Sequence, residues 1–219
     1  MIIVGICGGS GSGKSTFAER IRDGLSCSCE IMRLDCYYFD QGGKPFEERT
    51  KVNYNSPEIF DFDEMLEDIR LLLDGKPVTR KGYNYAEHRR DDSEELMYPP
   101  EVLIIEGIHV FYDDRICDIM NLKLFIKVDS DICLLRRIAR DMNERGRSLE
   151  SISEQYKATV KPMREKYIDK YIDKADVVVM RGGMNEQALK TTISYLKSCV
   201  KEQRPAESEK NESDGNDSE

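Results

Sequence analysis

Short apolar runs recur along the chain, and longer amphipathic stretches separate them. Within these runs apolar residues follow one another with little polar alternation, which is typical of parallel strands buried on both faces of a sheet. We expect five strands, at Ile2–Cys7, Glu30–Leu34, Val102–Ile105, Leu122–Val128 and Asp176–Met180.

Between most of these runs, apolar residues recur every three or four positions, which predicts helices with one buried face. We expect helices at Thr16–Leu25, Asp61–Leu73, Asp131–Glu144, Leu149–Asp173 and Asn185–Val200. Gly75 favours a stop to the second helix, Pro162 favours a break or bend in the fourth, and Asn185 suits the N-cap of the last. Strands that alternate with helices predict an α/β fold, a parallel sheet with helices on both faces.

The segment between the first strand and the first helix reads GGSGSGKST and fits the pattern G-x-x-x-x-G-K-[ST]. Glycines allow backbone N–H groups to converge on a phosphate, and the helix start adds its free N–H groups and positive dipole end. A flexible glycine-serine turn is the alternative interpretation, which the flanking strand and helix disfavour. The segment predicts a P-loop NTPase-type site for a nucleoside triphosphate, formed by Gly8, Gly9, Ser10, Gly11, Ser12, Gly13, Lys14, Ser15 and Thr16.

An acidic residue follows each of two other strands. Asp35 comes after the second strand, and Glu106 comes after Ile105. Because ligands of parallel sheets gather at the carboxyl ends of the strands, both carboxylates are expected near the phosphates. Carboxylates and a hydroxyl suit Mg²⁺, so we predict a metal site at Ser15, Glu106 and Asp35. An acid at a strand end is common by itself, and only the nearby phosphate loop favours a functional reading.

Composition limits the class of protein. The chain has 219 residues, of which 39% are hydrophobic and 34% charged, which favours one folded domain of about residues 1–201. The longest apolar runs fall short of a membrane span, and the N-terminus enters a strand directly, so we expect a cytoplasmic protein without a membrane partner. Seven cysteines in no C-x-x-C pair, with only two histidines, favour free thiols over zinc or disulfides.

The net charge of -9 is unevenly distributed. Residues 202–219 hold seven acidic and two basic residues and no large apolar side chain, so this acidic tail is predicted to be disordered. The acidic balance of the chain disfavours nucleic acid as a partner.

Five arginines fall within a span of twelve residues, in the third predicted helix and just beyond it. They are Arg136, Arg137, Arg140, Arg145 and Arg147. A solvated basic face paired with nearby acids is one interpretation, and we prefer it for Arg136. For the other four we expect an Arg-rich helical lid at about 136–160, because mobile guanidiniums stabilise the charge that spreads over a transferred phosphoryl group.

The stretch at about 76–100 alternates weakly and predicts a small β-hairpin outside the core. Tyr83 and His88 lie within it. An aromatic ring and a two-sided hydrogen-bonding ring suit a planar heterocycle. A structural role is the usual alternative for a single Tyr or His.

Together these residues resemble the uridine kinases (uridine-cytidine kinases), a family of P-loop kinases. The resemblance runs from Ile2 to about Lys197 and omits only the acidic tail. It is carried by Gly8–Thr16, Leu34–Asp40, Glu47–Tyr54, Glu87–Arg90, Ile104–Asp113, Asp131–Ser148, Gln155–Met163 and Ala175–Gly183. The phosphate loop is widespread, whereas its combination with ERGR and RGG is much more specific.

The resemblance implies phosphorylation of a pyrimidine ribonucleoside at its 5′-hydroxyl, with ATP or GTP as donor and Mg²⁺ as cofactor. It implies that Asp35 faces this hydroxyl, with Lys14, Arg140 and Arg145 as the other catalytic residues. The substrate-binding residues that it implies are Tyr38, Tyr54, Asn55, Tyr83, His88, Arg137, Arg147 and Gln155. It also suggests a homo-oligomer, specifically a tetramer.

Two positions depart from the family pattern. Members usually carry Asp where this chain has Asn55, and that Asp is expected to hold the 2′- and 3′-hydroxyls of the ribose. Asn55 offers a neutral acceptor instead, so we predict weaker ribose binding or a different acceptor. The second departure is Lys81-Gly82, where Pro-Val usually precedes the tyrosine, which is expected to loosen the hairpin.

Two alternatives stay open at this point. A phosphoribulokinase-like kinase of sugar phosphates would share most of these residues; Tyr83 and His88 disfavour it, while Asn55 mildly favours it. A nucleotide-binding regulator without catalysis is the other, and it is disfavoured by the full set of Lys14, Ser15, Asp35, Glu106 and the lid arginines.

Overall fold

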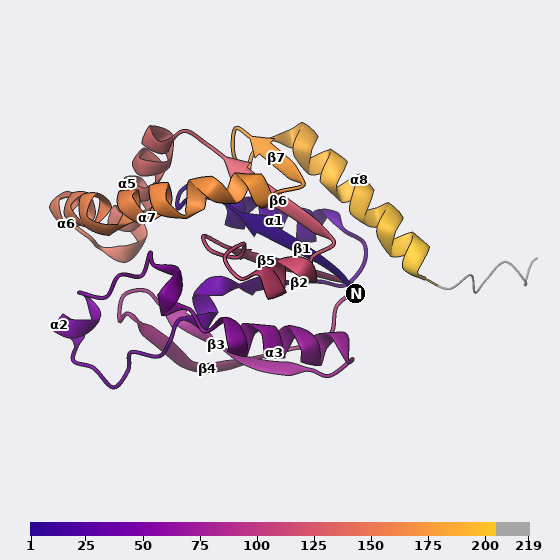
Figure 1. Ribbon diagram of the computed structural model, residues 1–219, viewed down its shortest axis with the longest axis horizontal. Helices are drawn as coiled ribbons and strands as arrows, with labels where there is room; N and C mark the ends of the chain where they lie inside the picture. The colour runs from indigo at the N-terminus through magenta and orange to yellow at the C-terminus, as the bar shows by residue number, and fades with distance from the viewer. Residues whose placement is uncertain (205–219) are drawn as a thin grey trace, which may run out of the picture.

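The computed structural model describes residues 1–204, apart from the side chain of Asp92. Five parallel strands form the central sheet: β1 (Ile2–Cys7), β2 (Cys29–Arg33), β5 (Val102–Gly107), β6 (Leu122–Lys127) and β7 (Val177–Met180). They lie in the order β2-β5-β1-β6-β7 (Figure 1). The parallel sheet and its five strands therefore confirm the prediction from the apolar runs.

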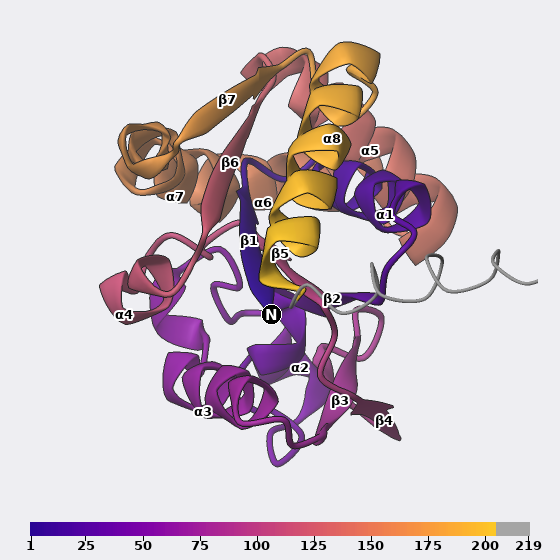
Figure 2. The same ribbon diagram turned by 90° about the vertical axis from the view of Figure 1, so that its right-hand side faces the viewer.

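Each face of the sheet is covered by helices (Figure 2). Along β1, Ile2, Val4 and Ile6 pack toward α1 (Lys14–Gly24) and α8 (Glu186–Gln203). Ile3 and Cys7, at alternate positions, pack toward the opposite face, which α3 (Phe62–Leu73), α4 (Asp114–Asp118) and a 3₁₀ segment (Ile168–Lys174) cover. This two-sided burial explains why the strands read as continuous apolar runs.

Helix ends follow the capping signals. The Asp61 side chain accepts a hydrogen bond from the Glu64 N–H at the start of α3, and Asn185 accepts one from the Ala188 N–H at the start of α8. Helix α8 continues to Gln203, and Arg204 pairs with Glu101 at 2.8 Å. Residues 202–204 thus belong to the folded part, and the rest of the predicted acidic tail lies outside the described residues.

The predicted hairpin consists of β3 (Val78–Asn84) and β4 (Arg89–Met97), which pair antiparallel and form a separate small sheet. Val78 and Met97 are buried in the core at its base. The register shifts between Lys81 and Tyr83, so the irregularity falls at Gly82, where the chain departs from the family pattern. Short helical segments at Leu34–Tyr37, Phe46–Arg49 and Pro57–Ile59 complete this side of the molecule.

The segment predicted as the lid, about 136–160, falls in α5 (Ser130–Arg145), α6 (Leu149–Gln155) and a π-helical segment (Tyr156–Val160), and α7 (Lys161–Lys166) follows it; we keep the name lid for this predicted segment. The prediction of one helix at Leu149–Asp173, broken or bent near Pro162, is confirmed in part, because the regular α-helix is interrupted by the π-helical segment just before Pro162. Pro162 is the second residue of α7, and proline cannot donate the N–H that continues a regular helix. The helical path ends at Tyr167, where φ is -122° and ψ is -61°, and the chain continues as the 3₁₀ segment.

All seven cysteines are free thiols, as the sequence predicts. Within residues 1–204, no helix is both long and apolar enough to cross a membrane.

Candidate active site

The phosphate loop follows β1 and leads into α1. Gly11 and Gly13 have φ values of 84° and 91°, a left-handed conformation that favours glycine, and a Cβ on Gly11 would lie 2.3 Å from the carbonyl oxygen of Cys133. Helix α1 begins at Lys14 without a side-chain cap. Its first N–H groups therefore remain available to an anion, with the positive end of the helix dipole behind them.

Two carboxylates lie beside this loop. Asp35 is in the 3₁₀ turn directly after β2, and Glu106 is in β5, which lies between β1 and β2 in the sheet. The Ser15 hydroxyl donates to Glu106 Oε1 at 2.9 Å. Glu106 is 5% exposed, and its burial raises the pKa of the carboxyl, an effect that the positive charge of Lys14 opposes. The order of the strands thus explains why acids far apart in the sequence meet at one edge.

The residues at this edge fit a magnesium ion. Glu106 Oε2 is buried and has no hydrogen-bond partner, so a buried carboxylate oxygen is left for a cation beside the Ser15 hydroxyl. Across residues 1–204, no group of three or more His, Cys, Asp or Glu side chains forms a complete metal site. Mg²⁺ suits such a partial site because it keeps several waters and takes other ligands from substrate phosphates.

Aromatic rings form the other end of the site. Tyr38 packs between Phe60, at 4.4 Å between ring centroids, and Tyr83, at 4.7 Å. His88 stacks on Tyr54 at 5.1 Å with 22° between the ring planes. Burial and the neighbouring arginines lower the pKa of His88, so the imidazole is neutral near pH 7 and can donate one hydrogen bond and accept another.

Asn55 lies deep in the floor of the site, with 6% of its surface exposed. Its Nδ2 donates to Thr159 Oγ1 at 3.2 Å, and its backbone carbonyl accepts from the buried ring of His109 at 2.7 Å. The Thr159 hydroxyl gives its own proton to the Gln155 carbonyl at 3.1 Å. Because Thr159 can therefore only accept from Asn55, the amide nitrogen must face Thr159 and the amide oxygen is left as an acceptor.

The lid arginines surround one buried carboxylate. Asp141 has no exposed side-chain surface, and it forms ion pairs with four guanidiniums, at 2.8 to 3.6 Å: Arg137, Arg140, Arg145 and Arg147. One negative charge thus faces four positive charges. The excess positive charge is directed to a region where a triphosphate would supply the missing anions.

Two of these arginines are joined through Gln155. Its amide oxygen accepts from Arg137 at 2.8 Å and from Arg147 at 2.6 Å. Arg137 also donates to Ser10 in the phosphate loop at 3.0 Å, which connects the lid directly to the loop. Burial lowers the pKa of Arg137 to about 10, so its guanidinium still carries a full charge at neutral pH.

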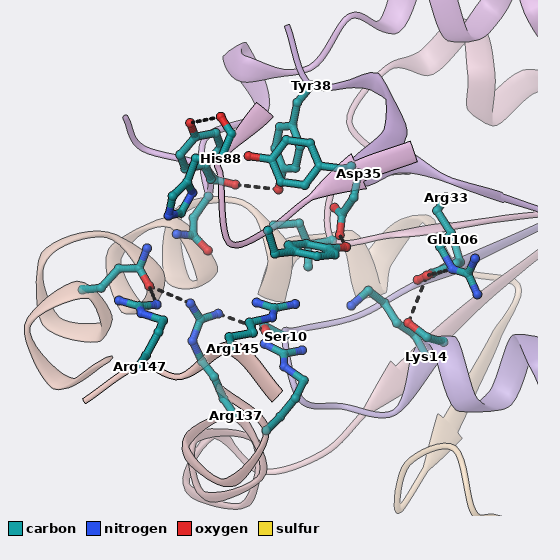
Figure 3. A pocket seen from close by; sticks show the side chains of 18 residues that line it. Ser10, Lys14, Arg33, Asp35, Tyr38, His88, Glu106, Arg137, Arg145 and Arg147 are labelled. Atoms are coloured by element: carbon teal, nitrogen blue, oxygen red, sulfur yellow. Dashed lines mark hydrogen bonds and ion pairs between the residues drawn. The ribbon is translucent and has the colours of Figure 1, made fainter. Parts of the chain in front are cut away.

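A cavity of about 280 Å³ connects these parts (Figure 3). In Figure 3, Arg137, Arg145 and Arg147 lie on one side, opposite Tyr38 and His88, and Lys14 and Glu106 lie at one end. The structure brings together all predicted catalytic, substrate and metal residues along its walls: Lys14, Ser15, Asp35, Tyr38, Tyr54, Asn55, Tyr83, His88, Glu106, Arg137, Arg140, Arg145, Arg147 and Gln155. Of the remaining loop residues, Ser10 also lines the cavity, whereas Thr16 in α1 is exposed.

Sequence reasoning missed several residues of the site. Arg33, Tyr85 and Ile108 line the same cavity, and Asp141 organises the lid. Tyr85 lies in the turn just after β3 (Val78–Asn84), so the period of two along the strand does not assign it a face. For Arg136 the expectation of a solvent-facing side chain is confirmed, since the residue is exposed.

Comparison with known proteins gives a family match over most of the chain. The model of the Phosphoribulokinase / Uridine kinase family matches residues 3–188. A uridine kinase of Ligilactobacillus salivarius (strain UCC118) is 41% identical over 201 residues, which cover 91% of this chain and 94% of that protein. A uridine kinase of Streptococcus uberis (strain ATCC BAA-854 / 0140J) is 43% identical over 202 residues, which cover 92% of this chain and 96% of that protein.

More distant solved structures share the fold. A putative fructose transport system kinase from Silicibacter sp. TM1040 aligns with a TM-score of 0.60 at 21% identity, covering 81% of this chain and 89% of its own. Phosphoribulokinase from Rhodobacter spheroides aligns with a TM-score of 0.58 at 14% identity, covering 82% and 69%. With a phosphate loop, two strand-end carboxylates and an arginine lid around one cavity, and with relatives similar over nearly its whole length, this chain belongs to the Phosphoribulokinase / Uridine kinase family.

Proposed function

We propose that this protein is a uridine kinase, which transfers the γ-phosphoryl group of ATP or GTP to the 5′-hydroxyl of uridine or cytidine and so serves pyrimidine salvage. The observation that carries the proposal is the single cavity that joins a triphosphate-binding loop to an end walled by Tyr83 and His88. The curated relatives named uridine kinase, which this chain matches over more than nine-tenths of its length, support the same reaction.

On the donor side, the loop N–H groups and Lys14 bind the β- and γ-phosphates. Ser15 and Glu106, with Asp35, would hold Mg²⁺, which when bound neutralises charge on the β- and γ-oxygens. The unpartnered Oε2 of Glu106 supports this assignment. Lid arginines such as Arg140 and Arg145 neutralise the remaining charge on the phosphoryl group as it passes between oxygens.

On the acceptor side, Asp35 orients the 5′-hydroxyl. The 5′-oxygen bonds to the γ-phosphorus while the bond from that phosphorus to the bridging oxygen breaks, and the hydroxyl proton passes to the Asp35 carboxylate. A carboxylate is a weak base, but a loose transition state requires the proton to leave late, so positioning contributes more than basicity.

The base and the ribose occupy the aromatic end of the cavity. Tyr83 contacts the face of the pyrimidine, and the neutral ring of His88 pairs with a polar edge of the base. The amide oxygen of Asn55 accepts from a nucleoside hydroxyl, and the amide nitrogen of Gln155, whose oxygen holds Arg137 and Arg147, donates to one. Tyr38 and Tyr54 shape the wall behind them, since both are buried and packed against other rings.

The test is a substrate comparison with the purified protein. ADP or GDP release is measured with ATP or GTP over uridine, cytidine and sugar phosphates such as ribulose 5-phosphate, and the product is identified by phosphorus NMR. We expect release that depends on uridine or cytidine and a 5′-monophosphate product. Release that depends on a sugar phosphate alone would support the phosphoribulokinase-like alternative, and release with no acceptor dependence would contradict kinase function.

Asp35→Asn tests the acceptor side separately. The amide keeps the shape of the side chain but takes up a proton poorly, so we expect most turnover to be lost while ATP affinity, measured by calorimetry, is kept. Turnover close to that of the unsubstituted protein would remove Asp35 from this role.

The assembly and location follow the resemblance only. We infer a homo-oligomer with a tetramer as the expected state, and light scattering on the purified protein would measure it. The cytoplasmic location stays a prediction.

A further inference from the structure

Tyr85 contacts three parts of the site, although sequence reasoning assigned it no role. It lies in the turn between β3 and β4, and its hydroxyl donates to Asp35 Oδ2 at 2.5 Å. The residues are fifty positions apart, and no element other than the projecting hairpin brings Tyr85 there. The phenol therefore occupies an oxygen of the carboxylate that the proposed reaction needs.

The same ring also contacts the lid. The guanidinium of Arg145 lies over the Tyr85 ring, 4.1 Å from its centroid, and Tyr83 meets the ring edge at 5.1 Å. Tyr85 lines both the main cavity and a second cavity of about 280 Å³, whose walls include Phe46 and Ser151. Tyr85 therefore forms part of the wall of both cavities, and it contacts Arg145 of the lid and Asp35.

The position of the phenol matters because an acceptor site without its acceptor contains water. Water at Asp35 can take the place of the 5′-hydroxyl: its oxygen bonds to the γ-phosphorus, the bond to the bridging oxygen breaks, and the proton passes to Asp35. This reaction converts ATP to ADP and phosphate without phosphorylating an acceptor. A donor already bound to Asp35 Oδ2 reduces the capacity of the carboxylate to orient and deprotonate such a water.

We propose that Tyr85 is a positioning residue that protects Asp35 from water until the acceptor alcohol replaces the phenol, and so suppresses ATP hydrolysis by the acceptor-free enzyme. The inference rests on the proposed function, since it takes Asp35 as the group that faces the acceptor. The ring of Tyr85 would keep its place beside Arg145 while the Asp35 side chain turns its oxygen from the phenol to the acceptor alcohol.

The experiment compares Tyr85→Phe with the unsubstituted full-length protein. Phenylalanine keeps the ring and its contact with Arg145 and removes only the hydroxyl. Without an acceptor we expect ADP release to increase about tenfold, the effect of losing one hydrogen bond to a charged group. With saturating uridine we expect kcat to change less than about twofold, because in the substrate complex the phenol has already left Asp35.

Tyr98→Phe is the matched control. Tyr98 follows the hairpin, is 66% exposed and does not line either cavity, so both rates are expected to stay unchanged. A second readout is uridine affinity by calorimetry, which Tyr85→Phe should leave equal or raise, because the alcohol no longer competes with the phenol. Melting curves of all three proteins establish that each is folded.

Two sets of results would overturn the inference. In one, ADP release without acceptor does not increase. In the other, transfer and uridine affinity fall together, which would make the hydroxyl a part of the productive complex. If the unsubstituted protein transfers to uridine but either set is observed, the inference fails alone; if it does not transfer to any nucleoside, the proposed function fails and the inference fails with it.

Discussion

His109 offers a quantitative test of the structure, because its ring is fully buried beneath the site. Nε2 lies 2.7 Å from the carbonyl oxygen of Asn55, which can only accept, so the proton is on Nε2. Nδ1 then accepts from the Tyr171 hydroxyl at 2.9 Å. Burial lowers the pKa of His109 to about 4; the carbonyl of Asn55 and the charge of Asp35 oppose this shift, and the charge of Lys14 adds to it.

This pKa predicts a specific pH dependence of stability. The pKa of a histidine in the unfolded chain is about 6.5, so between about pH 6.5 and pH 4 the unfolded chain binds a proton that the folded ring does not. The contribution of His109 to folding is therefore complete above pH 6.5 and falls as the pH is lowered. At about 1.4 kcal/mol per pH unit, the loss amounts to about 3 kcal/mol by pH 4.

The perturbation is His109→Gln, which keeps an N–H donor for the Asn55 carbonyl and cannot titrate. At pH 7 we expect the variant to be less stable by about 1 kcal/mol, because packing and the Tyr171 bond are impaired. At pH 4.5 the unsubstituted protein has lost about 2–3 kcal/mol that the variant keeps, so the order of stability should reverse.

The assay is urea denaturation followed by circular dichroism from pH 7 to pH 4.5. The quantity compared is the difference in unfolding free energy between the two proteins, since the other titrating groups contribute equally to both. His88→Gln is the control: this half-buried ring at the hairpin turn should change the pH dependence less. Parallel curves for His109→Gln and the unsubstituted protein would refute the assignment of a buried neutral ring.

Three further predictions follow from the site. Asp141→Asn leaves four lid guanidiniums without their shared anion, so we expect a loss of about 3 kcal/mol, a melting temperature about 6–12 °C lower and a reduced kcat; a melting temperature within about 2 °C would contradict this. Asn55→Asp gives the ribose a charged acceptor, so the KM for uridine should fall about fivefold. The free energy of unfolding should fall by about 1 kcal/mol, because the hydrogen bond to Thr159 is lost. An unchanged or higher KM would show that the residue does not touch the ribose. Gly183→Ala places a Cβ 2.1 Å from the carbonyl oxygen of Gly13, so ATP binding measured by calorimetry should weaken at least tenfold. Gly43→Ala is the control, because no atom lies within 4 Å of the added Cβ, and its ATP affinity should stay unchanged. Equal affinities of the two variants would show that the segment at Gly183 does not support the phosphate loop.

Local patterns were sufficient for the elements of the fold and for most of the site. A strand buried on both faces, such as β1, has a continuous apolar sequence, and a helix with one buried face, such as α3, has a three- and four-residue period, so each could be predicted without knowledge of its neighbours. Asp35 and Glu106 were predictable because the carboxyl ends of parallel strands share one edge. The strand order itself was not, since it depends on pairings between distant segments.

The features that sequence reasoning missed depend on contacts between distant parts of the chain. Asp141 belongs to the lid helix and could have been a solvated partner of its neighbours, and only the packing of the lid shows that it is fully buried. Tyr85 reaches Asp35 because the hairpin folds back over the site, which no local period encodes. The π-helical segment at Tyr156–Val160 likewise lies within a stretch that reads as an ordinary helix.

That π-helical segment connects the two halves of the site. Thr159 lies in it and accepts from Asn55 on the floor of the acceptor end, while its hydroxyl donates to the backbone carbonyl of Gln155. The side chain of Gln155 in turn holds Arg137 and Arg147 of the lid. A substrate hydroxyl that binds to the amide of Asn55 therefore contacts one end of a chain of residues whose other end holds two lid arginines in position. This connection gives a physical reason for an asparagine at position 55, because a carboxylate there could not donate to Thr159.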